Sequence, residues 1–542
     1  MSYFQLPIPG LENTLQGAPQ HPPAPPLTPQ EGDLVLGTPH HPPGIAQNSP
    51  QPGDMVLGFK PSEYQKAIFD WLATGEGSCV VNAVPGSGKT TTLIKGIHYI
   101  PKSLRSHFLA FNKHIAAELS LRLPKHIGAS TIHSLGLSSL CRRFRGRPEI
   151  NKRKYSEIVS RYLSDRNVYT PQRRQQLIEF IKFTQLTLTD PRDLPALKQL
   201  SHHYGLSSLE DWDFLQKAIL EILETGIRLS RACISYEDMI WLPIALNIPI
   251  QNYDFLCVDE AQDLNKAQLE IVLKACRSGA RGIYVGDRNQ AIMGFAASDC
   301  HSITQIVERT NALELPLSIC YRCPTSHIEL AAEIYSGIQP RADAPIGTVS
   351  HISISELPQR VKGEDLIICR CFYPLVPIYF DLLKQGIPAK VQNQDLDIQL
   401  ISLLKQIIGE SERSLSASTF TNLLNIWYER QKQEMEQDNA NVMAIVNLHD
   451  RILTLNAIYA GSNCQTTGDL KAAIANLCQD PKNAVVLTTI HGAKGLEANR
   501  VFHVRPNLVP HYRAEKDWEK EQERNLQFVS LTRAKQELFF VR

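Results

Sequence analysis

The stretch that decides the fold of this chain reads Ala83-Val84-Pro85-Gly86-Ser87-Gly88-Lys89-Thr90-Thr91. It follows an apolar run at 78–83 and leads into a helical pattern at 93–100. A glycine-rich loop between a strand and a helix turns backbone N–H groups and the helix N-terminus toward an anion. In such a P-loop Lys89 reaches the β- and γ-phosphates, and the hydroxyl of Thr90 coordinates Mg²⁺. We therefore expect this chain to bind a nucleoside triphosphate.

One position departs from the usual P-loop pattern G-x-x-x-x-G-K-[ST], because Ala83 replaces its first glycine. The strand before the loop and the helix after it still favour phosphate binding over a fortuitous glycine-rich turn. The residues expected to contact the nucleotide in this loop are Ala83, Gly86, Ser87, Gly88, Lys89, Thr90 and Thr91.

The composition is that of a globular protein with several domains. The chain has 542 residues, so about two to four domains are expected. A hydrophobic content of 43% and a charged content of 20% exclude a disordered or membrane-embedded chain. No apolar run reaches the roughly 20 residues that span a bilayer, and the N-terminus lacks the features of a signal peptide. We expect a cytoplasmic protein that makes no membrane contact.

Charge alone does not identify a partner. The net charge is +1, so nucleic-acid binding must rely on local basic patches. The most basic segment runs from Arg142 to Lys154. It could contact a duplex or a single strand, or it could form a solvated helix face.

The cysteines are scattered along the chain, apart from two close pairs. There are 12 cysteines, and the pairs are Cys320/Cys323 and Cys369/Cys371. A metal or iron–sulfur site needs about four ligands, and the spacing of the second pair does not suit a zinc knuckle. We therefore favour buried, reduced thiols over a metal site.

Residues 1–58 are rich in Pro, Gly, Gln and His and repeat themselves. A Gly-Asp-x-Val-Leu-Gly unit ends a nine-residue stretch at 50–58, and a similar unit ends the stretch at 29–37. Such a composition cannot bury enough apolar area to offset chain entropy, so we expect a disordered tail. The tail could be a flexible product of duplication, or its repeats could be docking motifs for a protein partner.

From residue 59 onward the chain is typical of α/β material. Apolar runs typical of strands lie at 79–83, 107–111, 255–258, 282–285, 366–369, 484–488 and 538–541. Helical patterns between them favour parallel sheets with helices on both faces. We expect two α/β cores, each interrupted by a helical insert. The first core comprises 59–141 and 233–311 with the insert 142–232, and the second comprises 312–395 and 481–542 with the short insert 396–480.

An acidic motif after a later strand adds to the chemistry predicted from the P-loop. The apolar run that ends at Val258 is followed by Asp259 and Glu260. Ligands of a parallel sheet lie beyond the carboxyl ends of its strands. Asp259 is therefore placed to hold Mg²⁺, and Glu260 to polarise the attacking water. A P-loop with an adjacent Asp-Glu pair indicates hydrolysis and not binding alone.

Ordered motifs between Gln65 and Lys535 make the chain resemble the UvrD/PcrA/Rep-type superfamily 1A DNA helicases. Tyr64-Gln65 resembles the Q motif, residues 108–113 resemble motif Ia and residues 130–134 resemble motif Ib. Residues 285–292 are similar to motif III, 317–324 to motif IV, 488–497 to motif V and 523–535 to motif VI.

The resemblance implies two RecA-like domains and a role for each matching residue around ATP. Gln65 would read the adenine edge and Tyr321 would stack on adenine, while Glu497 would hold the ribose. Gln290 would sense the γ-phosphate. Arg322 and Arg533 would contact that phosphate from the second core as arginine fingers, across a cleft.

The resemblance also implies an ATP-dependent translocase and helicase that moves 3′ to 5′ on single-stranded DNA and acts at duplex junctions, in repair or recombination. Residues implied to contact the strand are Phe111, Asn112, His133, Phe295 and His491.

Two departures from the family keep other functions open. The family's Trp-Arg-Gly-Ala after motif III is Phe295-Ala296-Ala297-Ser298 here, and the second insert is short. One alternative is a nucleotide-dependent DNA-binding switch ATPase that does not unwind. The other is an RNA-directed motor, since phosphate and stacking contacts hardly distinguish the two sugars.

Overall fold

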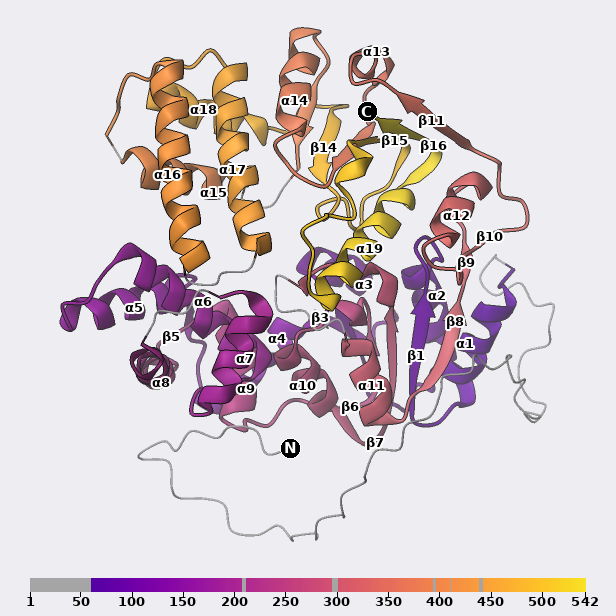
Figure 1. Ribbon diagram of the computed structural model, residues 1–542. Helices are drawn as coiled ribbons and strands as arrows, with labels where there is room; N and C mark the ends of the chain where they lie inside the picture. The colour runs from indigo at the N-terminus through magenta and orange to yellow at the C-terminus, as the bar shows by residue number, and fades with distance from the viewer. Residues whose placement is uncertain (1–59, 207–210, 295–300, 393–395, 410, 438–441) are drawn as a thin grey trace.

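A computed structural model describes residues 60–206, 211–294, 301–392, 396–409, 411–437 and 442–542. Figure 1 shows two α/β lobes, one above the other, with two groups of helices stacked at one side of them. The expected disordered tail at 1–58 lies outside the described residues. Within the described ranges, no helix has both the length and the apolar character needed to cross a membrane.

The first lobe is built on a six-stranded parallel sheet with the order β3-β2-β6-β7-β1-β8. Its strands are β1 (Ser78–Ala83), β2 (Ser106–Ala110), β3 (Gly128–Thr131), β6 (Tyr253–Val258), β7 (Cys276–Gly286) and β8 (Leu313–Leu317). The strands expected from apolar runs in this lobe are confirmed, although β7 begins earlier than expected, at Cys276. Continuous apolar strands such as β1 and β6 suit a sheet that helices cover on both faces.

Side-chain caps determine where several helices of this lobe begin. The helices are α1 (Glu63–Thr74), α2 (Lys89–Gly96), α3 (Lys113–Arg122), α4 (Ile132–Phe144), α9 (Tyr236–Ala245), α10 (Lys266–Ala275) and α11 (Ser302–Thr310). Ser62, Asn112, Thr131 and Asn265 each accept a backbone N–H at the start of a helix. Such caps satisfy donors that the helix itself leaves unpaired.

The first helical insert is tied to the first lobe by a buried ion pair. It contains α5 (Lys154–Asp165), α6 (Pro171–Thr187), α7 (Leu194–Tyr204) and α8 (Trp212–Leu229), between β4 (Glu149–Ile150) and β5 (Cys233–Ile234). Lys154 Nζ lies 2.5 Å from Asp238 Oδ2, and both side chains are buried. The hydroxyl of Tyr155 donates to the other carboxylate oxygen at 2.7 Å. Lys154 therefore acts inside the protein and does not belong to the exposed basic segment that precedes it.

We expect Asp238→Ala to lower the free energy of unfolding by about 3–5 kcal/mol, because it leaves the Lys154 ammonium buried and unpaired. A urea titration followed by circular dichroism measures the loss. Glu157→Ala, an exposed change on the same helix as Lys154, is the matched control and should cost little. A loss in Asp238→Ala no larger than the control's would contradict the structural role given to this pair.

The second lobe repeats the same design. Its parallel sheet has the order β11-β16-β15-β12-β14-β13. The strands are β11 (Thr348–Ile352), β12 (Leu366–Cys369), β13 (Ala389–Val391), β14 (Val485–Thr489), β15 (Ala498–Val504) and β16 (Ala534–Val541). The helices are α12 (Thr325–Ala332), α13 (Leu357–Arg360), α14 (Leu375–Lys384) and α19 (Asp517–Leu531), and a short pair joins β9 (Ile319–Cys320) to β10 (Gln339–Pro340). The expected fold class of two parallel α/β sheets is confirmed.

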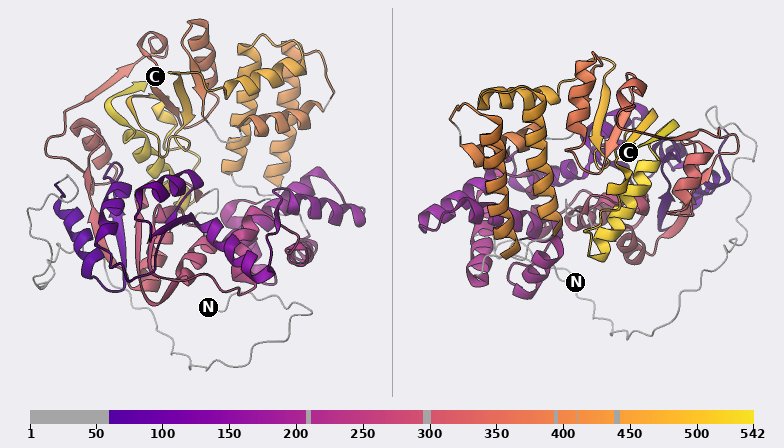
Figure 2. Two further views of the ribbon diagram at one scale, coloured as in Figure 1. Left: turned by 180° about the vertical axis from the view of Figure 1, so that it is seen from behind. Right: turned by 45° about the horizontal axis from the view of Figure 1, so that its top comes forward.

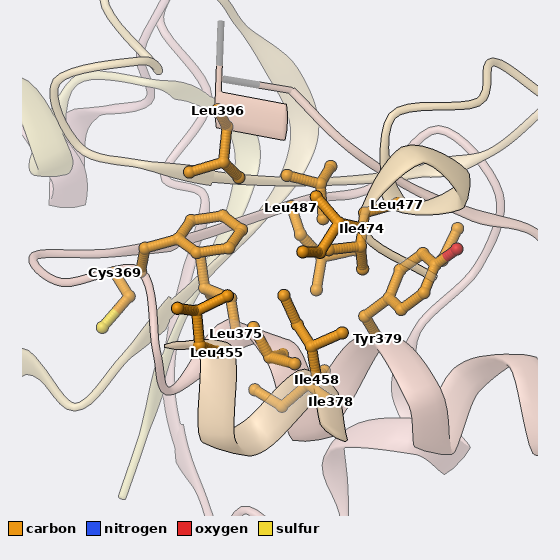
Figure 3. Packing of buried hydrophobic residues seen from close by; sticks show 14 of the residues in the cluster. Cys369, Leu375, Ile378, Tyr379, Leu396, Leu455, Ile458, Ile474, Leu477 and Leu487 are labelled. Atoms are coloured by element: carbon orange, nitrogen blue, oxygen red, sulfur yellow. The ribbon is translucent and has the colours of Figure 1, made fainter. Parts of the chain in front are cut away.

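The second helical insert shares one hydrophobic core with the second sheet. Its helices are α15 (Leu396–Ile408), α16 (Ala417–Gln437), α17 (Val442–Gly461) and α18 (Thr467–Leu477). Figure 3 shows Leu455, Ile458 and Ile474 of this insert packed toward Ile378 of α14 and Leu487 of β14. The insert is thus an extension of the second lobe's core. Seen from two further directions, α16 and α17 again stand over the helices of the first insert (Figure 2).

One expected boundary is wrong. The sequence prediction ended the first core at residue 311, but β8 pairs with β1 along Cys79–Ala83 and so belongs to the first sheet. This strand carries Glu314 and Pro316 between its leucines and lies at the sheet edge, where a proline is tolerated. A search for continuous apolar runs misses such a strand.

Candidate active site between the two lobes

The P-loop leaves the end of β1 and makes close contact with the segment that leads to the second lobe. Gly86 and Gly88 have φ of +67° and +76°, in the left-handed region that favours glycine. A Cβ on Gly86 would lie 2.6 Å from the Cβ of Arg322, so no side chain fits there. The carbonyl oxygen of Gly86 also accepts the N–H of Tyr321 at 2.9 Å. The loop therefore contacts Tyr321 and Arg322, the residues expected to bind the adenine and the γ-phosphate.

The predicted cation and carboxylates converge at the carboxyl ends of β1 and β6. Lys89 Nζ lies 3.3 Å from Glu260 Oε2, and the Thr90 hydroxyl donates to Asp259 Oδ2 at 3.4 Å. Glu260 has a φ of 53°, a conformation that costs a non-glycine residue about 1–2 kcal/mol. Such strain is concentrated at functional sites. Here it turns the carboxylate of Glu260 toward Lys89.

Burial and neighbouring charges shift the pKa values of Asp259 and Glu260 in opposite directions. Burial, followed by the charge of Glu260, raises the pKa of Asp259. Burial would also raise the pKa of Glu260, but the ammonium groups of Lys89 and Lys494 outweigh it and hold that pKa below its usual range. Glu260 is thus the ionised member of the pair, and Asp259 gains most from an added cation.

The residues present fit Mg²⁺ and a triphosphate. Mg²⁺ prefers oxygen ligands, often one or two from the protein, with water and phosphate completing its shell. The hydroxyl of Thr90 and the carboxylate of Asp259 supply that donor set. The hydroxyl of Ser87, in the loop itself, is buried without a hydrogen-bond partner among the described residues. Ala83 is buried at the end of β1, whereas Thr91 is exposed on α2.

A polar relay leads from this site to the second lobe. The amide of Gln262 donates to Glu260 Oε2 at 2.5 Å and accepts the N–H of Asp287 at 3.0 Å. Gln290 donates to Asp287 Oδ2 at 2.7 Å, and its own Oε1 accepts from Arg533 Nη2 at 3.1 Å. Arg533 of the second lobe thus contacts Gln290, the expected γ-phosphate sensor of the first lobe.

Arg533 remains a cation in this buried position. Burial, with the charge of Arg322 as the next cause, lowers the pKa of Arg533 to about 10. The guanidinium is fully enclosed, and it also donates to the carbonyl oxygen of Val529 at 3.0 Å. A dry, charged donor at the lobe junction is suited to binding an anion.

Arg322 and the expected ribose ligand are paired with each other in this structure. Arg322 Nε lies 2.6 Å from Glu497 Oε2, and Lys535 Nζ lies 2.6 Å from the other oxygen.

The two residues expected to contact adenine differ in exposure and in hydrogen bonding. Tyr321 is 41% exposed, whereas Gln65 is buried and uses its amide to bond Thr92 Oγ1 at 3.0 Å and the N–H of Ser62 at 3.0 Å.

Lys494 of the second lobe contacts the first lobe, a role that was not predicted from the sequence. Its ammonium lies 2.6 Å from Asp263 Oδ2 and donates to the carbonyl oxygen of Gln290 at 2.6 Å. Asn525 of α19 adds a second link, because its amide donates to the carbonyl oxygen of Ala291 at 2.9 Å. Lys494 lies inside motif V, and Asp263 follows the Asp259-Glu260 pair by three residues, which was the signal available in the sequence.

We expect Lys494→Ala to lower kcat for ATP about tenfold while leaving KM within a few fold, because it weakens lobe closure and not the phosphate contacts. Steady-state ATPase assays with single-stranded DNA measure both constants. Asp263→Asn and the double variant complete a mutant cycle, in which the two changes should be strongly non-additive. Additive effects would contradict a direct coupling across the lobes.

The residues expected to contact single-stranded DNA follow the carboxyl ends of β-strands, as the residues of the nucleotide site do. Phe111 follows β2 and is 43% exposed, while Asn112 caps α3 by accepting the N–H of Ile115 at 2.9 Å. His133 begins α4, directly after β3. Burial, then the charges of Arg370 and Lys494, lowers the pKa of His491 to about 3, so that ring is neutral at physiological pH. Phe295 lies outside the described residues.

A cavity of about 310 Å³ opens where the two helical inserts meet the second lobe. It is lined by residues of α6, α7, α17, α19 and the turn after β14, among them Phe183, Tyr204, Asn447, His491 and Trp518. Its aromatic rings already contact other rings, since Phe183 packs on Tyr204 and Trp518 stacks on His203. The cavity places one expected nucleic-acid contact, His491, beside the two inserts.

Two domain patterns of known proteins match the chain. Residues 64–311 match the UvrD/REP helicase N-terminal domain, and residues 484–541 match the UvrD-like helicase C-terminal domain. Together the matches cover more than half of the chain and contain the P-loop, Asp259, Glu260 and Arg533. The fold and the site thus define a two-lobed P-loop protein, and the chain belongs to the UvrD-like helicase family.

Three individual relatives agree with this assignment. F-box DNA helicase protein 1 of Schizosaccharomyces pombe is 22% identical, over 88% of this chain and 56% of that protein. ATP-dependent DNA helicase Rep of Buchnera aphidicola is 21% identical, over 86% of this chain and 91% of Rep. ATP-dependent DNA helicase PcrA of Leuconostoc citreum is 23% identical, over 54% and 40%. The chain thus spans little more than half of the first relative and most of the second.

Proposed function

We propose that this chain is an Mg²⁺- and ATP-dependent motor that moves along single-stranded DNA and unwinds duplex junctions. The observation that carries the proposal is the hydrogen bond from Arg533 of the second lobe to Gln290 of the first, within a relay that ends at Lys89 and Glu260. An arginine supplied across a cleft to a P-loop site is the arrangement that couples nucleotide hydrolysis to domain motion.

Substrate binding would exchange internal ion pairs for contacts to phosphate. Lys89 leaves Glu260 for the β- and γ-phosphates, and Arg322 leaves Glu497 for the γ-phosphate, which frees Glu497 for the ribose. Arg533 approaches the same phosphate from the second lobe. Because charge-assisted contacts to one anion then come from both lobes, the triphosphate stabilises the closed arrangement.

The departure of Lys89 also prepares Glu260 for catalysis. The Lys89 ammonium is the leading attraction that depresses the pKa of Glu260, so its removal makes the carboxylate a better proton acceptor. Gln262, bonded to Glu260, holds the carboxylate in place. Mg²⁺ held by Thr90 and Asp259 would neutralise charge on the phosphates. Glu260 then orients the attacking water and accepts its proton.

Loss of the γ-phosphate removes the anion that the arginines share, and the lobes reopen. The strand would be gripped in turn through Phe111, His133, Phe295 and His491. Movement from 3′ to 5′ and a role in repair or recombination are proposed from family resemblance. The cytoplasmic location is proposed from the sequence alone. The tail at 1–58 is proposed to dock a protein partner through its repeated Gly-Asp-x-Val-Leu-Gly units.

A strand-displacement assay tests the proposal. We expect ATP-dependent unwinding of a duplex with a 3′ single-stranded overhang and little unwinding with a 5′ overhang. Stimulated ATP turnover without displacement would instead favour the switch ATPase that binds DNA without unwinding. Equal displacement of RNA duplexes would favour the RNA-directed motor.

A further inference from the structure

Two cysteines flank the residues that join the P-loop to the second lobe. Cys320 ends β9, and Cys323 follows in the same turn, so that Tyr321 and Arg322 stand between them. Both thiols are free and buried. They belong to an apolar cluster that also contains Val84 of the P-loop and residues of α19. The pair therefore lies at the junction of the two lobes.

The two cysteines lie close together within one turn. Cys320 Sγ accepts the N–H of Cys323 at 3.4 Å. The neighbouring Cys323 side chain is the leading cause of the lowered pKa of Cys320, which favours its thiolate. A nucleophilic sulfur beside a second thiol is the arrangement from which a disulfide forms.

Both sulfurs also touch the nucleotide machinery. A Cβ placed on Gly86 would lie 3.0 Å from Cys320 Sγ, so this sulfur borders the P-loop. Cys323 Sγ donates to the carbonyl oxygen of Thr532 at 3.5 Å, and Arg322 Nη1 donates to the same oxygen at 3.2 Å. Any movement of Cys323 is therefore transmitted to Arg322 and to the residue before Arg533.

We propose that Cys320 and Cys323 form a reversible disulfide that switches off the nucleotide site under oxidation by a peroxide. The inference rests on the proposed function and adds regulation to it. Opening of the lobes exposes the buried pair to this small oxidant.

The chemistry balances with hydrogen peroxide. The Cys320 thiolate attacks one peroxide oxygen, the O–O bond breaks, and a sulfenic acid and hydroxide result. The Cys323 sulfur then attacks the Cys320 sulfur, the S–S bond forms, and the sulfenic oxygen leaves as water with the thiol proton. The hydroxide takes up the proton that Cys320 had released. The sulfurs lose two electrons in total, and the peroxide becomes two water molecules.

The bridge would misplace Arg322. It removes the S–H donor from the carbonyl of Thr532 and draws Cys323 toward Cys320, which tightens the turn that carries Arg322. A displacement of about 1 Å in a catalytic group can cost about a hundredfold in rate. Reduction of the bridge restores the thiols and the original turn.

Peptide mapping tests the bridge independently of activity. Trypsin cuts after Arg322, between the two cysteines. After treatment with hydrogen peroxide and alkylation of free thiols, the peptide ending at Arg322 should remain joined to the one beginning at Cys323 until a reductant is added. Separate, alkylated peptides from the oxidised protein would overturn the proposal.

ATPase assays on the same samples test the switch. Oxidation should lower the DNA-stimulated rate of the wild type about a hundredfold, and dithiothreitol should restore it. Cys323→Ser keeps a donor for Thr532 and should be active and insensitive to peroxide. Cys478→Ser, which removes an exposed thiol, is the matched control and should respond like the wild type. Equal losses in the wild type and Cys323→Ser would refute the switch. Joined peptides in a protein whose ATPase ignores DNA would leave the bridge standing and overturn the proposed function.

Discussion

Glu260→Gln should bind ATP with nearly unchanged affinity and hydrolyse it about a thousandfold more slowly, since it removes the proton acceptor while keeping the shape of the side chain. The glutamine can still bond Gln262, so the relay toward Asp287 keeps its geometry. It loses only the ion pair with Lys89, which the triphosphate replaces in any case. Equilibrium binding of a fluorescent ATP analogue and single-turnover hydrolysis measure the two quantities separately.

The matched control for this variant is Glu118→Gln, an exposed carboxylate on α3 far in sequence from the site. It should hydrolyse ATP at the wild-type rate. Turnover by Glu260→Gln within a few fold of this control would remove Glu260 from the role of base.

Arg533→Ala should lower the rate of ATP hydrolysis by about three orders of magnitude or more, the effect of losing an arginine finger. Its DNA affinity without nucleotide should stay near that of the wild type, because Arg533 is enclosed at the lobe junction and bonded to Gln290. Single-turnover hydrolysis and fluorescence anisotropy with a labelled single strand measure the two effects.

Arg524→Ala supplies the control, because Arg524 lies on the exposed side of α19 in the same motif. It should retain hydrolysis. Arg533→Lys, which keeps the charge but loses the planar fork, should recover only part of the rate. A variant of Arg533 that lost DNA binding and kept hydrolysis would contradict the finger assignment.

Most central strands could be predicted because both of their faces are buried, which favours an unbroken apolar run. The central strand β15 was missed, because Asn499, Arg500 and His503 interrupt its apolar sequence. The edge strands β3 and β8 of the first sheet and β11 and β13 of the second were missed as well. The sequence of β3, Gly128 to Thr131, contains no large apolar residue, and β8 carries Pro316 at a sheet edge. An edge strand is held by a neighbour on one side only, so its sequence is less constrained.

The convergence of Lys89, Thr90, Asp259 and Glu260 was predictable from the sequence, since each follows a strand of one parallel sheet. Contacts between the lobes were not. The pair of Lys494 with Asp263 depends on how two separate sheets dock, and no local pattern encodes that distance. The same holds for the second insert, whose helices looked like a separate module but share the core of the second sheet.

In the proposed mechanism, one ATP held between the two lobes drives a polynucleotide across them. The most direct test is the ATPase rate of the purified chain measured in parallel without polynucleotide, with single-stranded DNA, with duplex DNA and with RNA. We expect single-stranded DNA to stimulate the ATPase rate strongly and blunt duplex to stimulate it less. A turnover rate that stayed the same with every polynucleotide would contradict this mechanism.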